Sequence, residues 1–242
     1  MLLSFQMRKE ELINELRKSL TEPENAKEAV HFLSRIELEE SFPYLISLLK
    51  EKISKEKKME IIQILGESKQ EQVIPVLEEM LKEEEAEIRL CALYSLIKIH
   101  RPQVLPILKE ALENKQTKKV ALQGLVELVD ILPEEERKDI LKVFLNALST
   151  EESREEAIKG LGKMGDKCAV SPLMALFEKS DETYKRLILK SLSAIGGEEV
   201  KNFLFKKLKE EKEIKGEIIK ELEKLYFEEQ KEEFSIPEIW WE

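Results

Sequence analysis

A single leucine position recurs six times along this chain of 242 residues. The six leucines follow one another at a nearly constant interval, close to the period of helical-repeat proteins: Leu45, Leu77, Leu108, Leu141, Leu173 and Leu204. Four residues after each of them comes a second large apolar residue, as expected for two positions on one face of a helix. Such a period is typical of solenoids, in which each pair of helices buries its apolar face only against neighbouring pairs.

A second series of leucines indicates another helix before each of these positions. The anchors of these first helices are Leu33, Leu65, Leu96, Leu128, Leu161 and Leu192. In five of the six repeats the spacing from the anchor to the leucine of the second helix is identical, as from Leu65 to Leu77. Eleven residues before the anchors, four positions hold good N-cap residues: Ser54, Thr117, Thr150 and Asp181. Each repeat is therefore predicted to be a helical hairpin.

The turns inside the hairpins carry glycine or proline. Gly66, Gly165 and the pair Gly196 and Gly197 are expected to end first helices by adopting positive φ. Prolines suited to a first helical turn lie near the predicted starts of the second helices: Pro43, Pro75, Pro106 and Pro172. In the fourth hairpin the spacing from Leu128 to Leu141 is one residue longer and the linker around Pro133 has no glycine, so a different helix angle is expected there.

The predicted fold is an all-α, right-handed α-solenoid of one uninterrupted domain. An N-terminal cap helix at 1–21 precedes six hairpins within 22–210. The hairpin boundaries are 22–53, 54–84, 85–116, 117–149, 150–180 and 181–210. A C-terminal cap helix at 211–230 follows, and its apolar face is predicted to hold Ile214, Ile218, Ile219, Leu222 and Leu225. Residues 231–242 form an acidic, aromatic tail.

Two stretches share a more specific pattern. They are Glu85-x3-Arg89-x2-Ala92-x3-Leu96 followed by Val104-Leu105-Pro106-Ile107-Leu108, and Thr150-x3-Arg154-x2-Ala157-x3-Leu161-Gly162 followed by Ala169-Val170-Ser171-Pro172-Leu173. This pattern resembles HEAT repeats of the short bacterial, PBS-lyase-like kind, and the resemblance covers roughly residues 22–226. It implies scaffolding and protein binding, and no particular reaction.

Composition narrows the classes of partner. Forty Lys and Arg stand against 50 Asp and Glu, and half of the excess of −10 comes from residues 228–242. The rest of the chain mixes both signs, so no concentrated basic surface favours binding to nucleic acid or to an anionic membrane. No apolar run approaches the roughly 18 residues of a membrane span, and no signal segment is recognisable. We expect a cytoplasmic protein in which Cys91 and Cys168 are reduced and buried.

No catalytic or metal-binding motif is evident. Residues 160–165 match GxGxxG, but Leu161 is an anchor and the run is predicted to end a helix, whereas a dinucleotide site needs this loop before a helix. His31 and His100 have no partner at metal-ligand spacing. Glutamate runs at 83–85 and 134–136 are interpreted as the acidic starts of helices. No catalytic residue, cofactor or metal is therefore predicted.

The outward positions of the second helices are the predicted partner surface. One and two residues after each repeated leucine, side chains face away from the core, onto what is normally the concave side of a solenoid. In the C-terminal half these positions become apolar with lysines beside them, which indicates a candidate groove: Lys142, Val143, Met174, Phe205, Lys206 and Lys209. The alternative is that these are scattered surface residues of the ordinary kind.

The tail adds side chains of the type that anchor interfaces: Phe234, Ile239, Trp240 and Trp241. It is expected to dock in a groove, either its own or that of a second copy, or else to cover the last helix pair. The sequence thus predicts a non-catalytic scaffold or adaptor for a protein partner.

Two alternatives to a scaffold stay open. One is a nucleic-acid-acting enzyme similar to HEAT-like alkylpurine DNA glycosylases, although the repeats contain no tryptophan and carry a negative charge. The other is an accessory subunit of a cofactor-handling enzyme, as in bilin lyases.

Overall fold

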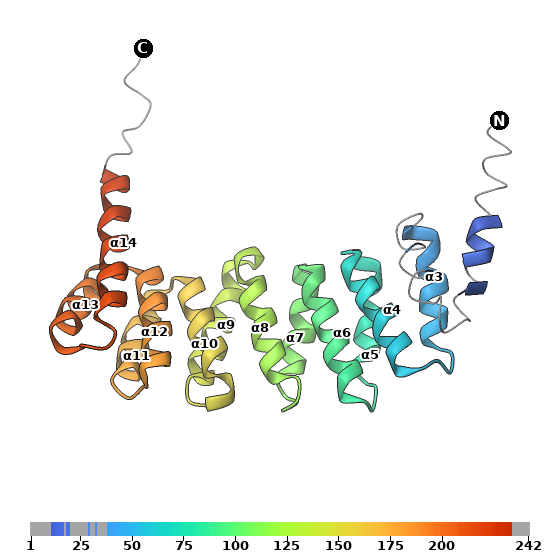
Figure 1. Cartoon of the computed structure of the whole chain (residues 1–242), viewed down its shortest axis with the longest axis horizontal. Coiled ribbons are helices and arrows are strands. Elements are labelled where there is room, and N and C mark those ends of the chain that lie inside the picture. The colour runs from blue at the N-terminus through green and yellow to red at the C-terminus, as the bar shows by residue number, and fades with distance from the viewer. Residues whose placement is uncertain (1–10, 17, 20–28, 30–31, 33–37, 234–242) are drawn as a thin grey trace, which may run out of the picture. The chain divides into compact units, whose positions relative to one another are not determined.

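A computed structural model describes residues 11–16, 18–19, 29, 32 and 38–233 (Figure 1). Within these residues the regular elements are all helices, and the all-α prediction is confirmed. Most of the predicted N-terminal cap helix, most of the first helix of the first hairpin and residues 234–242 lie outside the described part.

The chain divides into two compact units, 1–128 and 129–242, here called the N-terminal and C-terminal units. The division falls within the fourth predicted hairpin. In the N-terminal unit the helices from residue 38 on are α3 (Leu38–Leu49), α4 (Lys55–Glu67), α5 (Ile74–Met80), α6 (Ala86–Ile99), α7 (Leu105–Ala111) and α8 (Lys118–Leu128). A turn of 3-10 helix precedes each of the two short helices, η1 (Glu71–Val73) before α5 and η2 (Pro102–Val104) before α7.

The C-terminal unit continues the same alternation. Its elements are η3 (Val129–Ile131), α9 (Glu134–Ala147), α10 (Glu151–Met164), η4 (Lys167–Ala169), α11 (Val170–Phe177), α12 (Glu182–Ile195), α13 (Glu198–Glu210) and α14 (Lys215–Glu233). The predicted C-terminal cap helix corresponds to α14.

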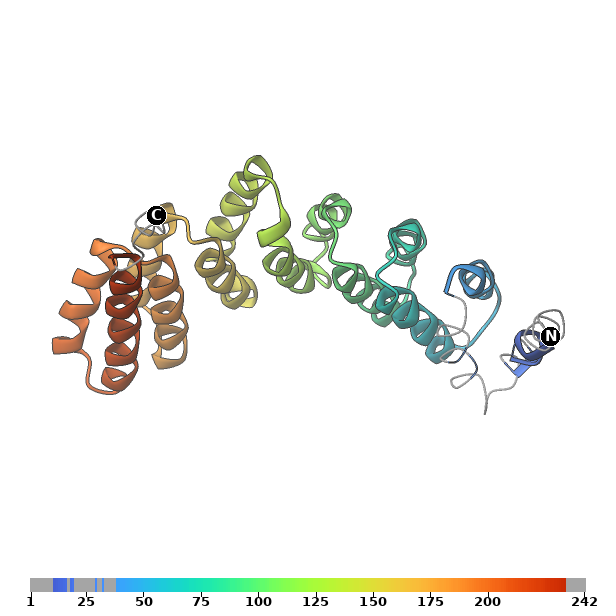
Figure 2. The ribbon, with the colours of Figure 1, turned by 90° about the horizontal axis from the view of Figure 1, so that it is seen from above.

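Each unit consists of two layers of helices (Figures 1 and 2). In the N-terminal unit the first helices α4, α6 and α8 pack on one another in order, and each second helix, α3, α5 or α7, packs against the first helix that follows it. In the C-terminal unit α10, α12 and α14 form the corresponding layer, and α9, α11 and α13 pack against them. This is the packing of an α-solenoid, as predicted.

Both leucine series lie in the core between the two layers. Their members within the described residues are buried, and all but Leu141 are fully buried. Burying one leucine side chain contributes roughly 1.5–3 kcal/mol, so the periodic apolar positions are what holds neighbouring hairpins together.

Two of the four predicted caps make the expected side-chain hydrogen bond, whereas Thr150 precedes α10 without one. The side chain of Ser54 accepts a hydrogen bond from the backbone N–H of Lys57 at 3.3 Å, and Asp181 accepts one from Tyr184 at 2.9 Å. Thr117 acts differently: its hydroxyl donates to the carbonyl oxygen of Ala111 at 2.7 Å and so ties the start of α8 to the end of α7.

The turn glycines were predicted correctly at two sites and wrongly at one. Gly165 ends α10 with φ 67°, and Gly196 ends α12 with φ 70°. Gly66, in contrast, lies inside α4, and the positive φ of that turn belongs to Lys69.

Gly66 is needed because neighbouring first helices approach closely there. A Cβ atom on Gly66 would lie 2.5 Å from the Cβ of Ser95 on α6, too near for both side chains to fit. The same relation recurs between α10 and α12, where a Cβ on Gly162 would lie 2.7 Å from the Cβ of Ser191. These glycines therefore set how closely adjacent hairpins pack.

Three other predictions need correction. Pro43 lies inside α3 and not near its start, because the helix already begins at Leu38. Cys91 is buried as predicted, but Cys168 is exposed, because it lies on η4, the outer turn between α10 and α11. Ile219 is half exposed, because α14 directs Ile218 and Leu222 to the core instead.

Candidate partner-binding surface

The outward positions of the second helices are accessible in both units. One and two residues after the repeated leucine, the side chains are half-buried or exposed: Ile46 and Ser47 on α3, Glu78 and Glu79 on α5, Lys109 and Glu110 on α7, Met174 and Ala175 on α11, Phe205 and Lys206 on α13. They are accessible because the residues at offsets zero and three or four turn toward the core.

On α9 the register differs from the prediction by one residue. Ile140 and Phe144 are fully buried, whereas Leu141 keeps 9% of its surface exposed. Ile140 follows the anchor Leu128 at the same spacing that separates the two leucines in the other hairpins. The apparent extra residue of this hairpin disappears in that register. Val143 is half-buried, as are the outward residues Ile46 and Glu78.

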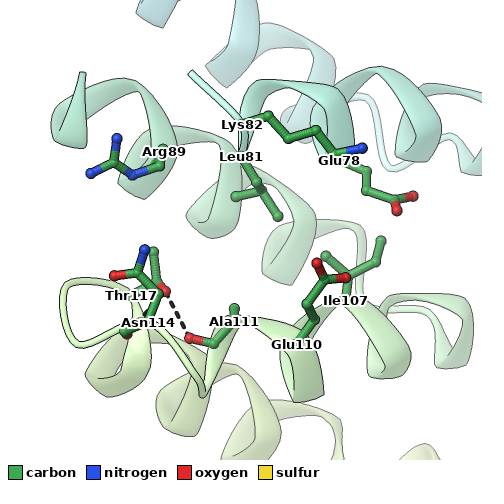
Figure 3. Close-up of a pocket in the computed structure, with 9 residues that line it drawn as sticks. All are labelled: Glu78, Leu81, Lys82, Arg89, Ile107, Glu110, Ala111, Asn114 and Thr117. Atoms are coloured by element: carbon green, nitrogen blue, oxygen red, sulfur yellow. Dashed lines mark hydrogen bonds between the residues drawn. The ribbon is translucent and has the colours of Figure 1, made fainter. Parts of the chain in front are cut away.

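A pocket of about 170 Å³ opens between α5 and α7 (Figure 3). Its walls come from these two helices, from α6 and from the turn before α8: Glu78, Leu81, Lys82, Arg89, Ile107, Glu110, Ala111, Asn114 and Thr117. Figure 3 shows Leu81 and Ala111 at the centre of the pocket. The carboxylates of Glu78 and Glu110 lie to one side of them, and the guanidinium of Arg89 lies to the other.

A second pocket, of about 260 Å³, lies one hairpin earlier, between α3 and α5. It is lined by Ile46, Leu49, Lys50, Glu51, Lys58, Val76, Glu79, Met80 and Glu83. Counted from the repeated leucine, Leu49 and Met80 occupy the same offsets as Leu81 and Ala111 in the first pocket. The two pockets are therefore one feature that recurs with the hairpin.

The basic residue beside each pocket is hydrogen-bonded to the turn that follows α5. Nη1 of Arg89 donates to the carbonyl oxygens of Glu83 and Glu84, at 2.7 and 2.6 Å, just after the end of α5. In the earlier hairpin Lys58 stands at the equivalent position, and its Nζ donates to the carboxylate of Glu83 at 2.9 Å. Cations are favourable at helix C-termini. The recurring Arg or Lys thus has a structural role at the pocket edge.

The equivalent position between α11 and α13 is filled by side chains. Phe177 and Phe203 meet edge to face, with ring centroids 5.4 Å apart. Lys207 stands at the offset of Ala111 and is almost fully buried. Its ammonium lies 5.8 Å from the centroid of Phe177 and 5.6 Å from that of Phe203. The groove that is open in the N-terminal unit is therefore closed here.

Ion pairs keep Lys207 charged inside this cluster. Its Nζ lies 2.6 Å from a carboxylate oxygen of Glu178 and 2.8 Å from one of Glu210. Burial by itself lowers the pKa of Lys207, but the hydrogen bonds to the two carboxylates outweigh it, and the pKa is raised above its usual value. The same bond lowers the pKa of Glu210.

The predicted groove residues of the C-terminal unit lie apart from these pockets. Lys142 is exposed and pairs with Asp139 at 3.2 Å, and Met174 is half-buried. Lys206 and Lys209 are exposed. Three of the predicted residues thus supply charge at the surface, and none of the residues named here lines a pocket described above.

Phe205 faces the terminal helix. Its ring meets that of Tyr226 on α14 edge to face, with centroids 6.4 Å apart. The predicted tail residues lie outside the described part of the chain: Phe234, Ile239, Trp240 and Trp241.

The layer of first helices carries a depression of about 510 Å³ between α10 and α12. Two of its side chains have partners. Arg186 bonds the carboxylate of Glu217 at 2.9 Å and that of Glu182 at 3.1 Å. The ring of Tyr184 lies under the guanidinium of Arg154, 5.6 Å from its centroid.

Two other kinds of site are absent from the described residues. No group of three or more His, Cys, Asp or Glu side chains in that part of the chain is placed to hold a metal ion. No helix there is long and apolar enough to cross a membrane.

The pockets between second helices were not predicted, and the residue three positions after the repeated leucine does not indicate them. It is the small Ala111 in the pocket between α5 and α7 but the large Met80 in the pocket between α3 and α5.

Comparisons with known proteins agree with this architecture. A family model described as HEAT repeats matches residues 43–128 and 139–223. Crystal structures of two engineered proteins resemble the chain, each at 18% identity and a TM-score of 0.53. The first match covers 78% of this chain and 96% of the engineered protein. The second covers 88% of this chain and 68% of the engineered protein. A designed armadillo repeat protein matches at 16% identity and a TM-score of 0.51, covering 76% and 99%. These likenesses show the fold alone. Among curated proteins none matches the sequence.

Proposed function

Because the chain belongs to the HEAT-repeat family, we propose that it is a non-catalytic scaffold that binds a protein partner along the exposed face of its second helices. This is the face that the sequence predicts to be concave. The partner is proposed to engage the N-terminal unit through the pockets that recur between α3, α5 and α7.

The recurrence of the pocket is the observation that carries this proposal. Successive first helices pack on one another, and packed helices lie about 8–10 Å apart, so the hairpins and their pockets repeat at about that distance. A polyproline II segment rises about 3.1 Å per residue and repeats every three residues, or about 9 Å. An extended partner segment in that conformation would therefore present one side chain to each successive pocket.

The lining chemistry indicates which side chains fit. The pocket between α5 and α7 has apolar surface at Leu81, Ile107 and Ala111 and carboxylates at Glu78 and Glu110. A lysine or arginine side chain places its aliphatic stem on apolar surface and its charge at a polar rim. We therefore favour a partner segment with basic residues at every third position.

The same charges disfavour the nucleic-acid alternative. Glu78, Glu79 and Glu110 stand at outward positions of α5 and α7. Binding to a phosphate backbone depends on Lys and Arg at the contact surface, and carboxylates there would repel it.

The proposal is tested by capturing partners from an extract of the source organism. Wild type is compared with two variants of the pocket between α5 and α7. Glu110→Lys reverses a charge at its rim, and Ala111→Leu fills it. Glu127→Lys is the matched control, because Glu127 is exposed on the first helix α8. We expect a protein that is captured by wild type and by the control but lost with both pocket variants. Equal capture by all four proteins would rule out this surface.

A further inference from the structure

The outer end of the C-terminal unit exposes large apolar side chains. Phe205 on α13 is 42% exposed, and on α14 the values are 50% for Ile219, 50% for Tyr226 and 58% for Phe227. The terminal repeat of a solenoid normally presents a polar outer face, because no further repeat covers it. α14 instead presents a surface that lacks a cover among the described residues.

Three of these side chains form a patch with lysines beside it. The edge-to-face contact of Phe205 and Tyr226 joins α13 to α14, and Phe227 follows on α14. Nζ of Lys201 lies 5.7 Å from the ring centroid of Tyr226. Lys209 is exposed one helical turn after Phe205, on the same face of α13. We call Phe205, Tyr226 and Phe227 the terminal aromatic patch.

We propose that the chain's own residues 234–242 fold back along α14 and cover the terminal aromatic patch. This interaction lies on a different surface from the partner pockets of the N-terminal unit and does not depend on them.

The reach of this segment matches the position of the patch. Phe227 lies six residues before the end of α14 at Glu233, or about 9 Å along the helix axis. Pro237 disfavours continuation of the helix through this segment. At about 3.3 Å per extended residue, residues 234–242 span about 30 Å, so a chain that turns back after Glu233 is long enough to bring Ile239, Trp240 and Trp241 to the patch.

Tyr94 provides a control in the N-terminal unit. It is an aromatic residue of the first helix α6 and is 46% exposed.

The chemistry of the segment complements the patch. Ile239, Trp240 and Trp241 are large apolar residues, and Glu238 and Glu242 flank them. Aromatic side chains in a desolvated site surrounded by opposite charge are typical of stable contacts. Because the segment is tethered to α14, its effective concentration at the patch is in the millimolar range, so modest affinity is sufficient.

The experiment uses the only two tryptophans of the chain, Trp240 and Trp241, as intrinsic probes. In the full chain we expect their fluorescence to be blue-shifted and protected from acrylamide. The double variant Tyr226→Ala with Phe227→Ala should shift the emission to longer wavelength and raise the quenching constant severalfold. Tyr94→Ala should leave both unchanged, and circular dichroism should show that all variants remain helical.

Other outcomes would overturn the proposal. Solvent-exposed tryptophans in the wild type, or identical spectra in wild type and the double variant, would show that the segment does not cover the patch. A spectrum that changes on dilution would assign the contact to a second copy. The pocket variant Glu110→Lys should leave the emission unchanged, so failure of the partner proposal and failure of this one are told apart.

Discussion

Phe203 of α13 stands edge-on to Phe177 of α11, with the ring planes 86° apart. At the equivalent offsets in the N-terminal unit stand Ile107 and Leu81, and a pocket remains between their helices. Whether the groove between successive second helices is open or closed therefore depends on a few side chains and not on the fold. This difference moves the candidate partner site from the C-terminal half, where the sequence placed it, to the N-terminal unit.

Lys207 should matter more for stability than its neighbour Lys206. Lys207 is buried with two carboxylate partners, and hydrogen bonds to charged groups contribute about 1.5–3 kcal/mol. We expect Lys207→Ala to lower the free energy of unfolding by about that amount. Lys206→Ala, an exposed lysine 3.9 Å from the same Glu210, should change it by less than about 0.5 kcal/mol. Urea denaturation measures both, and equal losses would contradict the closed cluster.

The contribution of Lys207 and Glu210 to the free energy of unfolding should also depend on pH, at both low and high pH. The folded pKa of Glu210 is lowered from 4.5, so its stabilising effect is present above that value and is lost as pH falls through the folded pKa. The folded pKa of Lys207 is raised from 10.5, so its effect is present below that value and is lost as pH rises through the folded pKa.

The difference in unfolding free energy between wild type and Lys207→Ala should therefore be constant from about pH 5 to about pH 10 and shrink outside that window. The same difference for Lys206→Ala should stay near zero throughout. If the difference for Lys207→Ala were the same at every pH, the substitution would remove only packing contacts and no ion pair.

The register of α9 can be tested with two adjacent substitutions. Ile140→Ala should cost about 2–5 kcal/mol, because it empties a fully buried site. Leu141→Ala should cost less, because Leu141 keeps 9% of its surface exposed and Ile140 none. Chemical denaturation of the two variants decides the matter, and the reverse order of costs would restore the register predicted from the sequence.

Because α10 and α12 approach closely at Gly162, we expect that adding even one methyl group there lowers the stability of the fold. Gly162→Ala places a Cβ against Ser191 and should destabilise the chain by about 1–3 kcal/mol despite the better helix propensity of alanine. Gly216→Ala is the control, because a Cβ on Gly216 of α14 meets nothing within 4 Å. It should be neutral or stabilising by up to about 1 kcal/mol. Melting temperatures provide the comparison.

Much of the fold could be predicted because it is periodic. The two leucine series placed the described hairpins in their correct order, and Ser54 and Asp181 cap helices where expected. In the fourth hairpin periodicity was ambiguous, since Ile140 and Leu141 are both apolar. Choosing the leucine by its identity gave the wrong register, because burial depends on the path of the chain between α8 and α9.

The site was harder to predict because a pocket is an absence of atoms between two helices. Outward offsets identify exposed residues, and they did so for Glu79 and Glu110. They do not show whether the side chains beneath meet, as Phe177 and Phe203 do, or leave space, as Leu81 and Ala111 do. That requires the distance and orientation of both helices at once.

The close contacts between first helices also limit how such a chain can change its length. Between α4 and α6 the small residue is Gly66 on the earlier helix, whereas between α6 and α8 it is Gly124 on the later one, which receives Ile97. Deleting the hairpin of α6 and α7 would bring the glycine-bearing faces of α4 and α8 together and leave a void where each now holds a side chain. The hairpins are similar in outline but not interchangeable, so loss or duplication of a whole repeat would need compensating substitutions at both new junctions.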